Sequence, residues 1–368
     1  MVGNYNRQLD RMLDVMTDDI GIVQHCDFDK PIKKTNNPYP YSIDDVARAL
    51  VVLSRISRID GFYSKIKERE KMAEKINHCV GVYLNFINRN KKPNGFFHNY
   101  QDLNGNPVKQ SINEEDSFAR VLSAWTEFLK GNFPKDLKEQ TRYDFIDELP
   151  ISLKLLSPIS QAISLMSLAR YLETEKDKSV VAASKIITFE LADRLSRQYK
   201  EHHEEGWVWF SDKMTYYSAK LPHSMLLSSQ ITERQSDKDI GKKTLDFLIK
   251  LTFEGFTFSP IGNRGWYTKQ DFFKGKSPPK YDQQTVEAYC MVEACSDAEK
   301  ILLIPGYEIY KKNAFEWFNG RNINKTSLLS KEGGVYDALV PKTNENPDGV
   351  NKNQGAESLL SYLMAASV

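Results

Sequence analysis

The chain has 368 residues, of which 40% are hydrophobic and 27% charged, and its net charge is +1. A chain of this size can bury a large core, and its balanced charge argues against a nucleic-acid partner, which would require a basic surface. No apolar leader begins the sequence and no run of eighteen apolar residues occurs, so we expect a cytoplasmic protein without a membrane span. The four cysteines lack CxxC spacing and are expected to be reduced core residues.

Apolar and amphipathic helices alternate along the first half of the chain. Ser42 and Asp45 have the spacing of a capping box before an apolar helix, and Asn113 is predicted to cap another. The hydrophobic periodicity predicts helices over residues 5–19, 42–57, 65–88, 114–129, 134–147 and 158–172. The helices over 42–57, 114–129 and 158–172 are apolar on most faces and therefore belong in the interior.

The alternation continues in the second half. Predicted helices cover residues 179–199, 219–229, 238–251, 283–300, 307–318 and 355–366. Between them lies a long loop, residues 255–282, in which glycines and prolines forbid a continuous helix but aromatic residues are frequent. Such rings either pack on the protein or stack on a ligand. Aromatic rings next to planar amide side chains are well suited to binding sugars.

The order of the helices predicts an all-α fold, the (α/α)6 toroid. Six apolar helices alternate with six amphipathic ones, and the long loops mostly lie before the apolar helices. Two concentric rings of helices explain this pattern, because the long loops then share one face with the N-termini of the inner helices. We predict a single domain over residues 1–368, in which residues 1–41 supply an outer helix and a loop that close the ring. A weak internal repeat, Asp44-x-x-Ala-Arg and Asp116-x-x-Ala-Arg, supports the prediction of a toroid built from repeated helical hairpins.

Polar residues gather in the first turns of the predicted inner helices and are expected to converge on one pit. Facing carboxylates shift one another's pKa values apart, which provides the acid and the base that glycosidic cleavage needs. The structural alternative is that these groups cap helices or form i,i+4 pairs, as Asp116 and Arg120 could. The residues concerned are Asp44, Asp45, Glu114, Glu115, Asp116, Asp282, Gln283, Gln284, Glu287, Asn351, Asn353, Gln354 and Glu357.

Other residues in the loops are candidates for sugar binding. Aromatic rings could stack on sugar faces or simply pack the loops, and polar side chains could bind hydroxyls. The stacking candidates are Trp207, Trp209, Trp266 and Tyr267; the polar candidates are His98, Asn99, Tyr100, Asp212, Tyr217, Arg264, Gln283, Gln284, Asn353 and Gln354. Tyr217 with His223 could serve a lyase or an epimerase, although core packing is the commoner fate of such rings. His202-His203 lacks companion ligands, and no nucleotide-binding or serine-hydrolase motif occurs, so we expect neither a metal nor a cofactor.

Several motifs in the same order resemble a largely uncharacterised bacterial family of six-hairpin toroid proteins. They are DDVARAL from Asp44, HNYQD from His98, EDSFAR from Glu115, FSPIGNRGWY from Phe258, DQQTVEA from Asp282, GGVYDAL from Gly333 and NQGAESLLSYL from Asn353. The resemblance implies the fold of many glycoside hydrolases, some polysaccharide lyases and the N-acylglucosamine epimerases. It also implies a pathway shared with a glycosyltransferase or a mannoside phosphorylase. The sequence departs from the pattern at Val46 and at Tyr217-Ser218.

These observations favour a carbohydrate-active enzyme, in particular a glycoside hydrolase that acts on a short oligosaccharide. Asp116 is the predicted general acid and Asp282 the predicted general base, with Asp45 and Glu357 as the next candidates. One alternative is a non-catalytic glycan-binding protein that partners a glycosyltransferase, in which every carboxylate of the pocket would be neutralised by Arg or Lys. The other is the lyase or epimerase that uses Tyr217 and His223.

Overall fold

The computed structural model describes residues 6–27, 30–31, 39–59, 69–109 and 113–368. These residues form two compact units, which are described separately. Unit 1 comprises residues 1–160, 331–335 and 353–367, and unit 2 comprises residues 161–330, 336–352 and 368. The prediction of a single domain over the whole chain stays a prediction.

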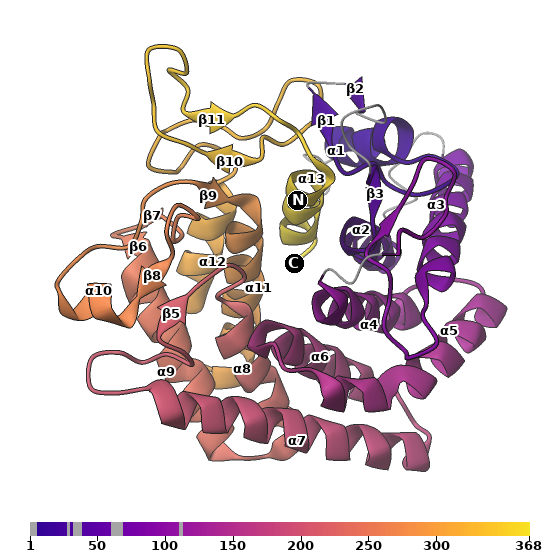
Figure 1. Cartoon of the computed structure of the whole chain (residues 1–368), viewed down its shortest axis with the longest axis horizontal. Coiled ribbons are helices and arrows are strands. Elements are labelled where there is room, and N and C mark those ends of the chain that lie inside the picture. Colours follow the sequence, from indigo (N-terminus) through magenta and orange to yellow (C-terminus); the bar gives the residue numbers. More distant parts are fainter. Residues whose placement is uncertain (1–5, 28–29, 32–38, 60–68, 110–112) are drawn as a thin grey trace. The chain divides into compact units, whose positions relative to one another are not determined.

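Unit 1 is built around α2 (Ile43–Ile56), which is buried on nearly every face. It packs against α3 (Arg69–Asn90), α4 (Glu114–Lys130) and α13 (Ala356–Ala366), as Figure 1 shows. The described residues of unit 1 also form α1 (Asn6–Asp10), the π-helix η1 (Arg11–Met16), α5 (Lys135–Glu148) and the 3-10 helix η3 (Leu149–Lys154). The apolar segments 42–57 and 114–129 therefore lie in the interior, as predicted.

Two predictions about helix starts in unit 1 have different outcomes. Ser42 caps α2 as predicted, because its side chain accepts a hydrogen bond from the Asp45 backbone N–H. Asn113 does not cap α4: it adopts the left-handed conformation at φ 55° and makes no capping hydrogen bond. The N-terminal helix predicted over 5–19 is shorter in the structure and continues as a π-helix from Arg11. Residues 65–68, where the next helix was predicted to begin, lie outside the described residues.

Unit 2 contains a pair of buried helices, α8 (Lys220–Thr232) and α11 (Thr285–Leu302), that pack against each other. On their outer sides α9 (Gln235–Thr252) packs against α8 and α12 (Tyr307–Glu316) packs against α11 (Figure 1). The other helices are α7 (Lys178–His202), which also contacts α8, and α10 (Lys269–Phe273). Helix α6 (Pro158–Leu172) has its first three residues in unit 1 and the rest in unit 2.

Short antiparallel strands brace the long loops within each unit. In unit 1, β1 (Cys26–Asp27) pairs with β2 (Lys30–Pro31), and β3 (Tyr41–Ser42) pairs with β4 (Tyr100–Gln101). In unit 2, β5 (Lys213–Met214) pairs with β8 (Tyr267–Thr268), and β6 (Phe253–Glu254) pairs with β7 (Thr257–Phe258). A three-stranded sheet has the order β11 (Val350–Asn351), β10 (Ala338–Leu339), β9 (Gln283–Gln284). The helix predicted to start at Gln283 therefore begins at Thr285, after this strand.

Two further expectations concern the chain as a whole. The four cysteines, Cys26, Cys79, Cys290 and Cys295, are free and buried, as predicted. In the part of the chain that the structure describes, no helix combines the length and the apolar character needed to cross a bilayer.

Candidate functional site

Four carboxylates and two arginines meet in unit 1, and we call them the carboxylate–arginine cluster. Its members come from the first two turns of α2, α4 and α13, where the sequence predicted that polar residues would gather. They are Asp44, Asp45 and Arg48 on α2, Asp116 and Arg120 on α4, and Glu357 on α13. The cluster joins three of the four residues predicted to be catalytic.

Arg48 connects α2 to α13. Its Nη1 donates to Asp45 Oδ1 at 2.9 Å and its Nη2 to Glu357 Oε2 at 2.7 Å. Asp45 is buried and is also held by the hydroxyl of its capping residue, because Ser42 Oγ donates to Asp45 Oδ2 at 2.8 Å. Glu357 differs from Asp45 in its accessibility, since 45% of its side chain is exposed.

Arg120 makes the second bridge, between α2 and α4. Its Nε lies 3.4 Å from Asp44 Oδ1 and its Nη2 lies 3.5 Å from Asp116 Oδ2. Asp116 also accepts a hydrogen bond of 2.8 Å from Ser160 Oγ. The i,i+4 pair between Asp116 and Arg120 that the sequence suggested is present, but it is part of a network that also includes Asp44.

Burial changes the protonation of the two aspartates on α2. Desolvation raises the pKa of Asp45 to about 6, although the Arg48 guanidinium opposes this shift and Glu357 reinforces it. Desolvation likewise raises the pKa of Asp44, against the pull of Arg120 and Arg48. The neighbouring carboxylates Asp116 and Glu357 also raise the pKa of Asp44. Burial within the cluster therefore favours a proton on a carboxyl group of α2.

We expect Asp45→Asn to stabilise the protein at pH 7. The pKa of Asp45 rises from its ordinary value of 3.8 to about 6 in the folded state, so folding holds this proton more tightly. The tighter proton binding adds to the free energy of unfolding; this contribution is fully present below about pH 4 and is lost as the pH rises through about 6. Asparagine cannot lose a proton, so the variant should gain up to about 3 kcal/mol at pH 7 and little at pH 4. Urea unfolding of both proteins at the two pH values measures this, and a pH-independent difference would contradict it.

Strand β4 brings the motif His98-Asn99-Tyr100 to the start of α2. Tyr100 pairs with Ser42 across the two strands, and the Ile43 backbone N–H donates to Asn99 O at 2.7 Å. Burial and the charges of Asp44 and Asp45 raise the pKa of Tyr100, so its hydroxyl stays protonated beside the cluster. The Tyr39 ring stacks on the Tyr100 ring, with centroids 4.8 Å apart.

The same motif contributes two buried polar atoms with no hydrogen-bond partner among the described residues. They are Asn99 Oδ1 and His98 Nδ1. Burial, followed by the nearby charge of Lys92, lowers the pKa of His98, which favours its neutral form. The motif thus borders the cluster through Tyr100, and its role in substrate binding stays a prediction.

Asp282, the fourth predicted catalytic residue, belongs to unit 2 and faces an arginine. Arg264 Nε donates to Asp282 Oδ2 at 3.0 Å, and 63% of the Arg264 side chain is exposed. Asp282 Oδ1 is buried and has no hydrogen-bond partner among the residues that the structure describes. The predicted base and the predicted hydroxyl-binding arginine are therefore direct neighbours.

Polar contacts also connect α8 and α11 in unit 2. Glu287 accepts hydrogen bonds from the backbone N–H groups of Tyr217 and Ser218, and Tyr217 has the left-handed φ of 60°. Lys220 Nζ donates to Glu293 at 2.5 Å, and both side chains are almost fully buried. One turn further along α8, His223 Nε2 lies 2.8 Å from Asp297 Oδ2, which also accepts from Arg170. Burial lowers the pKa of His223, and Asp297 opposes this shift.

Several predicted sugar contacts are wrong because the side chains are buried. Trp207 and Trp209 lie in the core, where Trp207 packs against Phe247 and Phe272, so neither ring can stack on a sugar. The rings of Tyr267 and Tyr217 are buried too. Gln354 is also buried, and the Gln283 amide is fully engaged by Ser259, Lys280 and Trp317.

The remaining predicted contacts lie at or near the surface. Asp212 is an exposed partner of His202 and Lys269. Trp266 keeps 43% of its surface exposed, with Lys213 Nζ 4.5 Å from its ring centroid. Gln284 and Asn353 are partly buried. Sequence reasoning missed Ser160 and Tyr39: an apolar helix pattern marks no single serine, and Tyr39 stands in a proline-rich loop.

Comparison with known proteins identifies the fold. No protein-family model matches the sequence, and no curated protein resembles it in sequence. A sugar epimerase from a ruminal bacterium superposes with a TM-score of 0.67 at 10% identity, covering 100% of this chain and 96% of its own. A cellobiose 2-epimerase from Spirochaeta thermophila has a TM-score of 0.65 at 11% identity, and the match covers 98% of this chain and 91% of the epimerase. A GH76 α-mannanase from Bacteroides thetaiotaomicron has a TM-score of 0.62 at 10% identity, and the match covers 100% of this chain and 96% of the mannanase.

The chain has the (α/α)6-toroid fold. The prediction of an all-α toroid is thus confirmed. At these identities the likeness concerns the fold alone, and the proteins that share this fold include both epimerases and a mannanase. The choice of chemistry must therefore come from the residues of this chain.

Proposed function

We propose that this toroid is a carbohydrate-active enzyme and, within that class, a glycoside hydrolase. The observation that carries the proposal is the carboxylate–arginine cluster, in which burial raises the pKa of Asp44 and Asp45 beside other carboxylates. Glycosidic cleavage needs one protonated carboxyl group and one ionised carboxylate close to the bond. The carbohydrate-active proteins that share the fold support the same substrate class.

Within the cluster, Asp44 is our candidate for the general acid. Burial raises its pKa, which favours the protonated form, and 20% of its side chain is exposed. Asp116, the general acid predicted from the sequence, accepts a hydrogen bond from Ser160 and pairs with Arg120. These contacts suit a role in positioning Arg120 beside Asp44. Glu357 is the most exposed carboxylate of the cluster and forms an ion pair with Arg48, so it is our candidate for the base or nucleophile. A basic role for Asp282 stays a prediction.

The two alternatives are less well supported. A lyase or epimerase that used Tyr217 and His223 would need both rings to reach the substrate, but both are buried and His223 is bonded to Asp297. A purely glycan-binding protein was expected to have all its carboxylates neutralised. In the cluster, burial raises the pKa of Asp44 and Asp45 although Arg48 and Arg120 lie beside them, which favours an acid/base site over fully neutralised carboxylates.

Proton NMR of the protein with manno-, gluco- and galacto-oligosaccharides tests the proposal. Hydrolysis should produce new reducing-end anomeric signals with the natural protein, and the first anomer formed shows inversion or retention. Epimerisation would instead give a new sugar spectrum without any increase in reducing ends. Line broadening of a sugar without new signals would support the binding protein and refute the hydrolase.

A further inference from the structure

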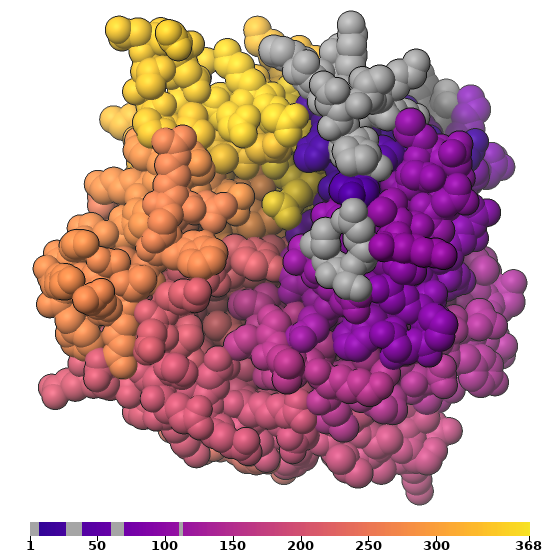
Figure 2. Space-filling view, in the orientation of Figure 1, coloured from indigo at the N-terminus to yellow at the C-terminus, as the bar shows by residue number. Residues whose placement is uncertain are grey.

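A groove of about 620 Å³ opens in unit 2, next to Arg264. Most of its wall comes from strand β11 and the loop that joins β10 to β11, which is yellow in Figures 1 and 2. The volume lies within the range of small-ligand pockets, about 300–1,000 Å³. The lining combines apolar Val340, Pro341 and Val350 with hydroxyl and amide groups of Thr343, Asn346 and Asn351.

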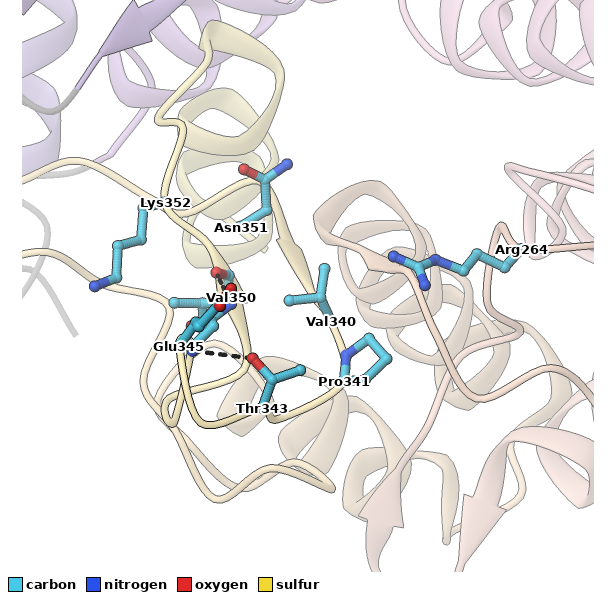
Figure 3. A pocket seen from close by; sticks show the side chains of 9 residues that line it. Arg264, Val340, Pro341, Thr343, Glu345, Val350, Asn351 and Lys352 are labelled. Atoms are coloured by element: carbon cyan, nitrogen blue, oxygen red, sulfur yellow. Dashed lines mark hydrogen bonds between the residues drawn. The ribbon is translucent and has the colours of Figure 1, made fainter.

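The groove is preformed, because hydrogen bonds fix the loop that lines it. The Asn324 side chain donates to Val340 O at 2.9 Å and to Gly349 O at 2.8 Å, which ties both ends of the loop together. Thr343 Oγ1 accepts from the Asn346 backbone N–H at 3.0 Å, the contact drawn in Figure 3. Gly349 has a left-handed φ of 65°, and a Cβ there would lie 2.4 Å from Asn324. A ligand therefore meets a wall that needs little ordering.

Arg264 is held in place beside this wall. Its guanidinium end points toward Val340 and Pro341, whereas Lys352 extends to the other side (Figure 3). Nε is occupied by Asp282, but neither Nη group has an acceptor among the described residues. Two backbone hydrogen bonds hold the supporting loop, because the Arg264 N–H donates to Tyr281 O and the Asn263 N–H donates to Asp282 O. Asp282 thereby orients two unused donor groups toward the groove.

We propose that this groove is a binding site for a neutral oligosaccharide, with Arg264 as its hydroxyl-binding residue and Asp282 as the residue that positions it. The charges of Arg264 and Lys352 are balanced by those of Asp282 and Glu345, so the site carries no excess charge to attract an anion. The parallel Nη donors of a guanidinium match two adjacent hydroxyl oxygens, and the apolar wall suits the C–H face of a sugar ring. The choice of a sugar rests on the proposed function, but the site itself does not depend on the cluster in unit 1.

Isothermal titration of the Asp44→Asn protein with manno-, gluco- and galacto-trisaccharides tests the site without turnover. We expect one neutral series to bind, and Arg264→Met added to this background should weaken it at least tenfold, because hydrogen bonds to a charged group are lost. Asp282→Asn should weaken binding less than Arg264→Met, because it frees the guanidinium without removing it. Lys276→Met is the matched control: Lys276 is also 63% exposed and paired with an aspartate, but it does not line the groove.

The outcomes separate this inference from the hydrolase proposal. Binding that depends on Arg264, in a protein that never shows turnover, would support the groove and refute the hydrolase. If the natural protein turns over a sugar but Arg264→Met binds the trisaccharide with unchanged affinity, the groove proposal is refuted and the hydrolase proposal stands. A uronate-containing trisaccharide that binds tenfold more tightly than its neutral counterpart would overturn the assignment to neutral sugars.

Discussion

Replacing Lys220 by methionine should lower the free energy of unfolding by about 3–5 kcal/mol. The Lys220 ammonium group and the Glu293 carboxylate form a buried ion pair between α8 and α11, with only 6% and 2% of the side chains exposed. Burial lowers the pKa of Lys220, but Glu293 and Tyr289 more than offset this, so its pKa is raised and the lysine is charged. Without the lysine, Glu293 would be a buried charge without its cationic partner.

Urea unfolding followed by circular dichroism measures the loss. The double variant Lys220→Met/Glu293→Leu is the control, since replacing both partners by apolar side chains should restore most of the stability. Lys242→Met removes a lysine from a comparable ion pair at the surface, in which the side chains of Lys242 and Asp246 are about 40% exposed. This variant should lower the free energy of unfolding by less than about 1 kcal/mol. A loss below about 1 kcal/mol in Lys220→Met would show that the buried pair contributes little.

Asp44→Asn should reduce kcat for oligosaccharide hydrolysis by about 10²- to 10⁴-fold, the usual contribution of a general acid. The substitution keeps the size of the side chain but removes the carboxyl group whose pKa burial raises. If Asp44 is the acid, activity in the natural protein falls as the pH rises through its raised pKa. The variant should lose this dependence along with most of its rate.

Asp19→Asn provides the matched control, because the Asp19 side chain is 96% exposed and the chemical change is the same. It should leave kcat within about twofold, as expected for a surface substitution. Unfolding curves of Asp44→Asn should show that the protein remains folded. A folded variant with full activity would remove Asp44 from the mechanism and return Asp116 to the role of acid.

Local patterns in the sequence were sufficient to predict most of the fold. Helix α6 occupies the predicted range, Pro158–Leu172, and the capping box of α2 is present. These features depend on residues a few positions apart, as helix periodicity and capping do. The start of α11 was displaced because Gln283 and Gln284 pair with β10, more than fifty residues later in the chain. A distant strand partner leaves no trace in the local pattern.

The candidate site was harder to predict, for the same reason. The sequence indicated that carboxylates lie at helix N-termini, but not that Arg48 would pair with Glu357, 309 residues away, or Arg120 with Asp44. Aromatic content also cannot separate exposed rings from buried ones. Trp266 is open to solvent, whereas Trp207 and Trp209 are enclosed by other rings of the same loops.

Unit 1 draws its segments from distant parts of the sequence, which has a consequence for synthesis on the ribosome. Helix α2 is completed at Ile56, but its packing partner α13 and the Glu357 carboxylate follow about 300 residues later. At about 5–20 residues per second, α2 waits some 15–60 seconds with an apolar face and Arg48 uncovered. Unit 2 is largely complete by residue 352. We therefore expect the nascent chain to fold its later unit first and to depend on chaperones until α13 emerges.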